Sequence, residues 1–460
     1  MMLPSNYQRI VLRGLPYERG HTHGEQARQK ILDSLAHYHA PGKLLPWETS
    51  LRIIKEIYLP GIEKYFPEAL PELQGIADGA GVDLDEILFL NARYDLARVR
   101  GSTIRPCPSS SNTSPSKAAV NGHGTRNGHN RSQSAVLGDD ISDMQELQEC
   151  TTAGFLAESM SNGDIILAQN WDMSANVYLK DTAVYLEIHP DASEDLPAMF
   201  VMTEAGQLGR SGFNSAGLGV CASSLMSTED YFPLDLSLPP GSPQEPLLPM
   251  SLVRRQFLHN TNFANALINV KNAPRHLSNK LIVGTADNFI MSLEITPGAV
   301  HLGYPSNGDN FVVASNHFTS ESFQASQWND RYPGGSSWFR AVRVAQRVRP
   351  SNNKQLTEES ITEAFCDHLS LPSSVCQHME DCTVKNVPDY PYKGAQTTLA
   401  HVRYNLTKRT TSVCKGPPCM GKFDQYSLPI TSNLGQHENR EIGVNYTIVN
   451  GKLRKQEQSQ

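Results

Sequence analysis

The sequence predicts an α+β protein in which antiparallel sheets are covered by helices. Most of the first hundred residues show the apolar spacing of amphipathic helices. From residue 150 onward, short strands grouped in hairpins dominate, and helices recur between these groups. Because strands joined by tight turns pair antiparallel, the two observations together favour antiparallel sheets with helices packed against them.

The segment 1–100 is expected to be mostly helical after one opening strand. Residues 7–12 alternate between apolar and polar side chains, which is typical of a strand. Helical patterns follow over 23–40, 51–58, 67–80 and 83–97. The last of these begins with acidic residues, which interact favourably with the positive end of a helix dipole.

The composition changes over the segment 101–149. Half of the residues in 101–140 are Ser, Gly, Asn or Pro, and none is Phe, Trp or Tyr. Such a segment cannot bury enough apolar surface to offset the entropy it would lose on ordering. We therefore predict a disordered polar insert here, followed by a core domain over 150–415 and a C-terminal extension over 416–460.

The core domain is expected to be rich in strands. Hairpin turns are indicated by Ser161-Asn162-Gly163 and by Ala286-Asp287-Asn288. Strands are expected over 150–156, 165–169, 183–189, 198–203, 218–223, 280–285, 289–295, 311–315, 397–404 and 410–414. Helices are expected over 249–270, 338–348 and 358–369.

The bulk composition argues against nucleic-acid and membrane partners. The net charge is −7, so the chain has no general attraction for a polyanion. It has no run of eighteen apolar residues, and its start lacks the pattern of a secretory signal. Eight cysteines in 460 residues are too few for a disulfide scaffold, so a cytoplasmic location is expected.

No metal or cofactor site is predicted from the cysteines. Cys414 and Cys419 bracket Lys-Gly-Pro-Pro, which is a spacing that zinc sites use. No second pair of ligands accompanies them in the sequence, and we interpret them as ordinary thiols.

The first core hairpin brings together groups that could do chemistry. Cys150 lies twelve residues before Asn162, and Asp172 lies ten residues after it. In an antiparallel pair these positions are nearly opposite, offset by a residue or two. A thiol beside a carboxylate is a plausible activated nucleophile, whereas an isolated cysteine in a strand is more often a buried structural residue.

Several blocks of sequence, in order, resemble one known family. They are Gly14–Gly20 with His23-Gly24, Glu72–Ala77, Leu90–Arg93, Cys150–Ala153, Ala168–Asp172, Thr203–Gly206, Gly212–Gly217, Ser315–His317, and Ser337-Trp338 with Arg340 and Arg343. Over roughly 8–415 this ordered set resembles the isopenicillin N acyltransferases and related self-cleaving amidases, which are cysteine N-terminal-nucleophile hydrolases.

The resemblance implies a four-layer αββα fold and an inactive precursor that cleaves itself between Glu149 and Cys150. The products would be an α chain, 1–149, and a β chain, 150–460, which stay associated. The new α-amine of Cys150 has an unperturbed pKa near ~8, so it could take the thiol proton near neutral pH. Attack on a substrate would then form a thioester that water or an amine resolves.

The resemblance also implies roles for other residues. Asp172 would orient the amine and thiol, and the side-chain amide of Asn316 would stabilise the oxyanion. Asn170 would support Asp172 on the same face of its strand. Lys393 stands near the place where the family has an arginine, shortly before a late Thr-Leu strand.

The expected activity is acyl transfer or amide hydrolysis on a small amide-bearing secondary metabolite, with acyl-coenzyme A as a possible acyl donor and an amine as acceptor. Two departures keep an alternative open. Glu149 replaces the glycine that precedes the nucleophile in penicillin-making members, and Lys393 replaces the arginine. The alternative is an uncleaved, inactive homologue that binds a small ligand or a partner. The chain ends in Gln458-Ser459-Gln460, which is not a peroxisomal tripeptide.

Overall fold

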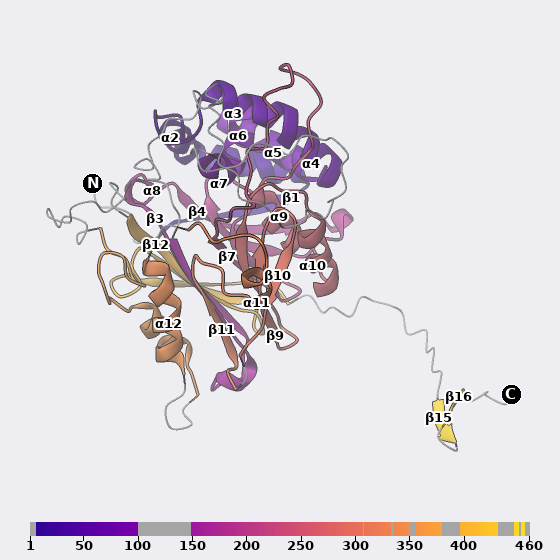
Figure 1. The fold of residues 1–460 in the computed structure, drawn as a ribbon, viewed down its shortest axis with the longest axis vertical. Helices are drawn as coiled ribbons and strands as arrows, with labels where there is room; N and C mark the ends of the chain where they lie inside the picture. The colour runs from indigo at the N-terminus through magenta and orange to yellow at the C-terminus, as the bar shows by residue number, and fades with distance from the viewer. Residues whose placement is uncertain are drawn as a thin grey trace, which may run out of the picture.

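The computed structural model describes residues 6–99, 149–306, 308–332, 335–349, 355–379 and 396–430, together with the backbone of 446–449 and 452–455. The insert predicted over 101–149 lies outside the described residues except for Glu149. Within the described chain, two large sheets lie between two groups of helices (Figure 1).

The larger sheet has eight strands in the order β1-β4-β5-β6-β7-β8-β9-β10. Their bounds are β1 Gln8–Gly14, β4 Ala183–Pro190, β5 Met199–Glu204, β6 Ser211–Asn214, β7 Leu218–Ser224, β8 Asn279–Thr285, β9 Phe289–Ile295 and β10 Val300–Gly303. All pairs are antiparallel except the edge pair β1–β4, which is parallel. The expectation of purely antiparallel sheets was wrong at this edge because β1 and β4 are joined by a long crossover rather than a hairpin.

The smaller sheet has six strands in the order β11-β2-β3-β12-β13-β14, and all of its pairs are antiparallel. Their bounds are β2 Glu149–Phe155, β3 Ile166–Ser174, β11 Phe311–Ala314, β12 Gln396–Asn405, β13 Thr410–Lys415 and β14 Phe423–Ser427. A separate hairpin pairs β15 Tyr446–Val449 with β16 Lys452–Lys455. The predicted nucleophile hairpin, β2–β3, therefore lies in the middle of the smaller sheet.

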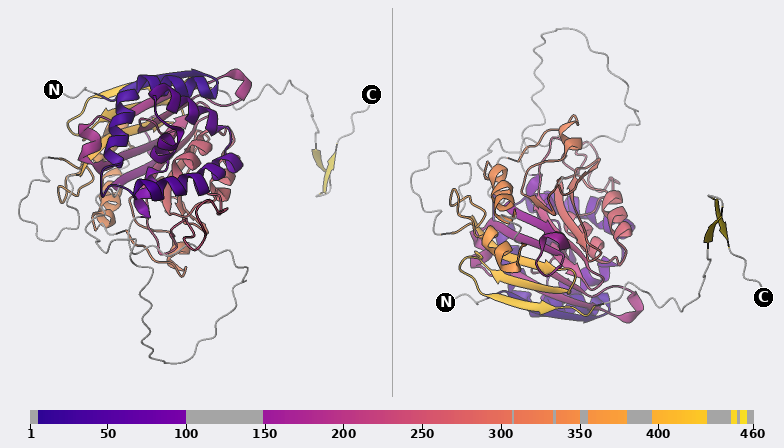
Figure 2. Two further views of the ribbon diagram at one scale, coloured as in Figure 1. Left: turned by 90° about the horizontal axis from the view of Figure 1, so that it is seen from above. Right: turned by 90° about the horizontal axis from the view of Figure 1, so that it is seen from below.

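Helices cover the outer face of the larger sheet (Figure 2, left). They are α1 Pro16–Gln26, α2 Arg28–Tyr38, α3 Trp47–Ile53, the π-helix Ile54–Tyr58, α4 Leu59–Tyr65, α5 Ala69–Ala80, α6 Leu84–Asn91, α7 Arg93–Arg98, α9 Met250–Leu258 and α10 Phe263–Asn272. The single helix predicted over 249–270 is two helices because the Asn262 side chain accepts a hydrogen bond from the Asn265 backbone and starts α10 anew.

A second helical layer covers the smaller sheet, with α12 Ser336–Val348 and α13 Glu358–Phe365 packed on it (Figure 1). Short helices complete the described chain: Ala157–Ser159, α8 Ala175–Leu179, Ala192–Glu194 and α11 Glu321–Gln324. A third apolar cluster lies between the sheets and includes Leu167, Trp171, Phe200 and Phe213. The order of layers is helix, sheet, sheet, helix, so the predicted four-layer αββα fold is confirmed.

Two blocks of the family resemblance, 14–24 and 72–77, meet where α1 crosses α5. A Cβ on Gly20 would overlap the carbonyl oxygen of Glu72, and one on Gly75 would overlap that of Tyr17. Only glycine permits this close approach of two backbones. These blocks therefore serve packing rather than chemistry. No helix within the described residues is long and apolar enough to cross a bilayer.

Candidate active site

The β2–β3 hairpin sets the position of Cys150. Cys150 pairs with Trp171, and Glu149 pairs with Asp172, so Cys150 and Asp172 are offset by one residue, within the one or two that the residue count predicts. Paired residues share a face of the sheet, so the Cys150 side chain lies with Trp171 in the apolar layer between the sheets. Asp172 lies on the opposite face, where its Oδ1 accepts a hydrogen bond from the Thr398 hydroxyl at 2.6 Å.

Asn316 lies directly beside Cys150, just after β11. Its Oδ1 accepts a hydrogen bond from the backbone N–H of Cys150 at 2.8 Å and a second from Arg340 Nη2 at 2.8 Å. Its Nδ2 donates to the carbonyl of Ser224 at 3.0 Å. These bonds orient the amide, with the oxygen toward Cys150.

Arg340 is a site residue to which sequence reasoning assigned no role. It is fully buried on α12, and its Nη1 donates to the carbonyl of Cys150 at 2.7 Å and to the Thr151 hydroxyl at 2.9 Å. One guanidinium thus fixes both the backbone of the nucleophile and Asn316. The sequence feature that could have identified it is its position on the apolar face of α12, four residues before Val344 and eight before Val348.

Arg210 was also missed. It precedes β6 in the glycine-rich stretch, and its Nη2 donates a hydrogen bond to Cys150 Sγ at 3.2 Å. Its guanidinium carbon lies 4.2 Å from the centroid of the Trp171 ring. Arg210 lies between Gly209 and Gly212, and an arginine flanked by glycines next to the family-like block Gly212–Gly217 was the available clue.

The pKa of the Cys150 thiol is raised by burial and by the charge of Asp172, and lowered by the Arg210 and Arg340 guanidiniums and a backbone hydrogen bond from Asp172. The net shift is upward because the sulfur is completely enclosed. The thiol is therefore protonated at neutral pH in the continuous chain, and a base is needed to activate it.

Several buried guanidiniums are grouped near Cys150. They belong to α7, to α9 and to the turn before β6. Arg210 and Arg93 each lower the pKa of Arg254, although burial is the larger cause, and it brings this pKa to about 10. The guanidiniums of Arg98 and Arg254 lie over the Tyr94 ring at 5.3 and 5.2 Å.

Two carboxylates offset part of this positive charge. Glu204 pairs with Arg93 and accepts a hydrogen bond from the Tyr38 hydroxyl at 2.7 Å. Burial raises the pKa of Asp95 to about 7, so this carboxyl is only partly ionised at neutral pH. Neither Nη atom of Arg98 bonds to a residue that the structure describes. Among the described residues of this region, guanidiniums outnumber carboxylates.

The remaining predicted site residues have different outcomes. Asn170 donates to the carbonyls of Phe365 at 3.0 Å and Val375 at 2.8 Å, and its Oδ1 accepts from His401 Nδ1 at 2.7 Å. It therefore ties β3 to the segment after α13. Lys393 lies outside the described residues.

Comparison with known proteins was made against families, curated sequences and solved structures. No protein-family model matches the chain. The acyl-coenzyme A:6-aminopenicillanic-acid-acyltransferase 40 kDa form of Emericella nidulans is 23% identical over 417 residues, covering 89% of this chain and 92% of that protein.

Similarity to solved structures is weaker. Penicillin V acylase from Agrobacterium tumefaciens is 14% identical, covers 58% of this chain and 83% of its own, and has a TM-score of 0.35. A mutant conjugated bile acid hydrolase from Clostridium perfringens is 12% identical, covers 62% and 99%, and has a TM-score of 0.35. Such distant likeness says nothing about substrates, so the sequence relationship is the informative one. Over 89% of its length, the chain is a distant homologue of an acyl-coenzyme A:6-aminopenicillanic-acid-acyltransferase.

Proposed function

We propose that this chain is a cysteine enzyme that cleaves itself ahead of Cys150 and then carries acyl groups on the Cys150 sulfur. The observation that carries the proposal is that every polar atom of Cys150 has a dedicated partner. Arg210 donates a hydrogen bond to the sulfur, and Arg340 donates one to the carbonyl. Asn316 accepts a hydrogen bond from the N–H. A structural cysteine in a strand satisfies its N–H and carbonyl through neighbouring strands, and its sulfur needs no buried cation.

Self-cleavage would begin with attack of Cys150 Sγ on the carbonyl carbon of Glu149. The S–C bond forms, the C–N bond breaks, and the thiol proton passes to the departing nitrogen. Water then hydrolyses the thioester, which leaves a carboxylate on Glu149 and a free thiol and α-amine on Cys150. Arg210 would favour the thiolate during the attack.

The two chains would remain together after the cut. The strand β1 of the α chain pairs along its whole length with β4 of the β chain, and the N-terminal helices bury their apolar faces on the larger sheet. Separation would expose this core to water, which is strongly unfavourable.

Turnover would use the new amine as the base. The α-amine takes the thiol proton, the sulfur attacks the substrate carbonyl, and the proton passes to the leaving group as the C–N or C–S bond breaks. Asp172 would orient the amine, and the Asn316 side-chain amide would donate to the oxyanion. Water or an amine then resolves the thioester.

The substrate would be a small amide or thioester with an anionic group. The excess of buried guanidiniums near Cys150, from Arg93, Arg98, Arg210 and Arg254, supports this class. The name of the distant homologue specifies a coenzyme A thioester and 6-aminopenicillanic acid, an amine. We propose a thioester or amide donor and an amine or water acceptor for this chain as well.

Intact-mass analysis of the purified full-length protein tests the proposal. We expect two species, with the β chain beginning at Cys150, and one uncut species for Cys150→Ala. Cys366→Ala is the matched control, because it removes a half-buried thiol elsewhere and should leave cleavage unchanged.

The second candidate is an uncleaved homologue that binds a small ligand or partner. The complete burial of the Cys150 sulfur in the continuous chain favours it. A wild-type preparation that stays in one piece and forms no acyl adduct with thioester probes would support binding and exclude the enzyme.

A further inference from the structure

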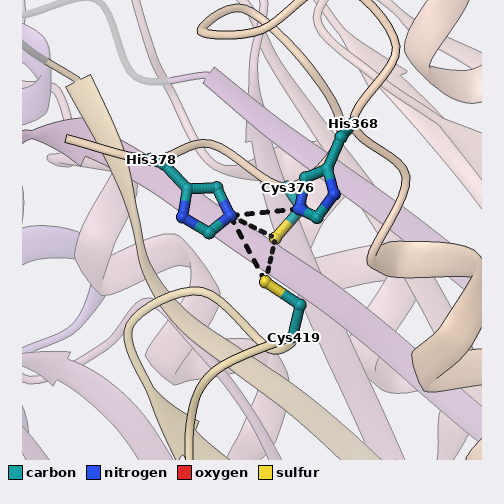
Figure 3. Close-up of side chains that lie close together, drawn as sticks. All are labelled: His368, Cys376, His378 and Cys419. Atoms are coloured by element: carbon teal, nitrogen blue, oxygen red, sulfur yellow. Dashed lines mark hydrogen bonds between the residues drawn. The ribbon is translucent and has the colours of Figure 1, made fainter. Parts of the chain in front are cut away.

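Four side chains that commonly bind metals converge away from Cys150. His368, Cys376 and His378 belong to the segment that follows α13, and Cys419 lies in the turn between β13 and β14 (Figure 3). Their ligand atoms all lie within 4.8 Å of one another. The sequence alone did not indicate that His368, Cys376 and His378 lie beside Cys419.

Four of the six separations between the ligand atoms are close to those of a tetrahedral zinc site. Zn–S bonds of about 2.3 Å and Zn–N bonds of about 2.0–2.1 Å imply S–S, S–N and N–N separations of about 3.8, 3.6 and 3.3 Å. The Cys376 and Cys419 sulfurs are 3.7 Å apart. His378 Nε2 lies 3.5 Å from Cys376 Sγ, 3.3 Å from Cys419 Sγ and 3.0 Å from His368 Nε2.

The backbone holds these ligands in place on both sides. The Cys376 N–H donates to the carbonyl of Asp367 at 3.0 Å, and the Ser374 hydroxyl donates to the carbonyl of Cys376 at 2.6 Å. Around Cys419, the N–H groups of Met420 and Gly421 donate to the carbonyl of Pro417 at 3.1 and 3.2 Å. Such preorganisation lowers the entropy lost when a metal binds.

We propose that His368, Cys376, His378 and Cys419 bind one zinc ion. Two thiolates and two imidazoles are a soft, nitrogen-containing donor set that suits zinc and not magnesium or calcium. Four protein ligands fill the tetrahedral shell and leave no position for substrate, so the site is structural. The ion would fasten the segment 366–379 to the β13–β14 turn.

The proposed zinc site is connected to the nucleophile hairpin. Gln377 lies between two of the ligands, and its N–H donates to the Thr398 hydroxyl oxygen at 2.9 Å. That hydroxyl donates in turn to Asp172 Oδ1 at 2.6 Å. A bound zinc ion would thus fix the position of Gln377 and, through it, of Thr398, which donates to Asp172. This consequence rests on the proposed function, whereas zinc binding itself does not.

Metal analysis of the full-length protein tests the site. We expect about one zinc per chain in protein purified without a polyhistidine tag, and nearly none in Cys376→Ser/Cys419→Ser. Cys366→Ser is the matched control, since its thiol lies on the same segment but outside the four ligands, and it should retain zinc. Wild-type protein that fails to take up added zinc, or equal loss in Cys366→Ser, would overturn the assignment.

Cobalt substitution gives a second readout that does not depend on how well the double variant folds. The Co²⁺ protein should show thiolate-to-metal charge transfer and the intense visible bands of tetrahedral cobalt, and Cys419→Ser, a change at an exposed position, should weaken the charge transfer. Spectra of octahedral cobalt, or a Cys376–Cys419 disulfide mapped in freshly purified protein, would contradict the proposal. Cys150→Ala should keep its zinc, so a failure of the proposed enzyme chemistry is separable from a failure of this site.

Discussion

Arg210 donates a hydrogen bond to the sulfur of Cys150 across 60 positions of sequence, at 3.2 Å. The bond joins the turn before β6 in the larger sheet to the start of β2 in the smaller one. A buried cation beside a thiol favours the thiolate, so the stacking of the two sheets affects how readily the Cys150 thiol ionises.

Arg210→Gln should make the Cys150 thiol harder to ionise. We expect the alkylation rate of the cleaved enzyme by iodoacetamide to rise only at a higher pH than in wild type. Acyl transfer at pH 7 should fall by on the order of 10²-fold, because a preorganised charge is lost. Arg52→Gln, which removes a surface partner of Glu56, is the control and should leave both unchanged. A pH profile of alkylation identical to that of wild type would show that Arg210 does not control ionisation of the Cys150 thiol.

Asn316→Ala should slow self-cleavage and turnover together. It removes the acceptor of the Cys150 N–H and the proposed oxyanion donor, and such a donor is worth on the order of 10²–10³ in rate. Time courses of fragment formation after synthesis measure the first step, and kcat the second. Asn269→Ala, at a partly buried asparagine on α10, should have no effect. Normal cleavage in Asn316→Ala would show that its amide is only structural.

Arg340→Met should destabilise the fold. The guanidinium satisfies the Cys150 carbonyl, the Thr151 hydroxyl and Asn316, and its loss leaves buried acceptors unpaired. We expect a loss of about 3 kcal/mol in the free energy of unfolding by denaturant titration. Arg349→Met, at a residue whose side chain is 58% exposed, should change it by less than about 0.5 kcal/mol.

Stability should fall at acidic pH through Glu294. Burial by itself would raise the pKa of Glu294, but the Lys280 ammonium and hydrogen bonds from Lys280 and Ser320 lower it from 4.5 to about 2. A depressed pKa means that the unfolded chain binds the proton more readily, so this stabilisation is complete above pH 4.5 and disappears as pH falls toward 2.

The fall in the pKa of Glu294 from 4.5 to about 2 corresponds to about 3 kcal/mol of stability, because each pKa unit is worth 1.36 kcal/mol. Lys280 also donates to the carbonyl of His317, so the pair supports the residue next to Asn316. The pH slope of unfolding between 4.5 and 2 should be shallower in Lys280→Met/Glu294→Gln than in wild type. Equal slopes would show that other carboxylates dominate acid unfolding.

The sequence predicted what local geometry controls. The connection between β2 and β3 runs from 156 to 165 and contains the short helix Ala157–Ser159, yet counting residues from Asn162 placed Asp172 within one position of Cys150. The arrangement of hairpins and helices likewise predicted antiparallel sheets covered by helices, and the family resemblance implied the four layers. The helix predicted over 249–270 was wrong because a capping side chain at Asn262 competes with an otherwise continuous apolar pattern.

Contacts made by packing were not predictable in the same way. Arg340 reaches Cys150 over 190 positions, and only the assembly of α12 on the smaller sheet brings them together. The proposed zinc ligands are spread similarly, since Cys419 follows His378 by 41 positions, a spacing that belongs to no standard zinc motif. Their segment is held against β12 by the hydrogen bond from the Gln377 N–H to Thr398.

The sulfur of Cys150 has no exposed surface in the continuous chain. A molecule in solvent would therefore contact other residues and could not reach the thiol. Under the proposed function, severing the Glu149–Cys150 bond would create the amine and would also allow Glu149 to leave its pairing with Asp172. The precursor would thus be latent for two reasons, because it lacks the base and because its sulfur is enclosed.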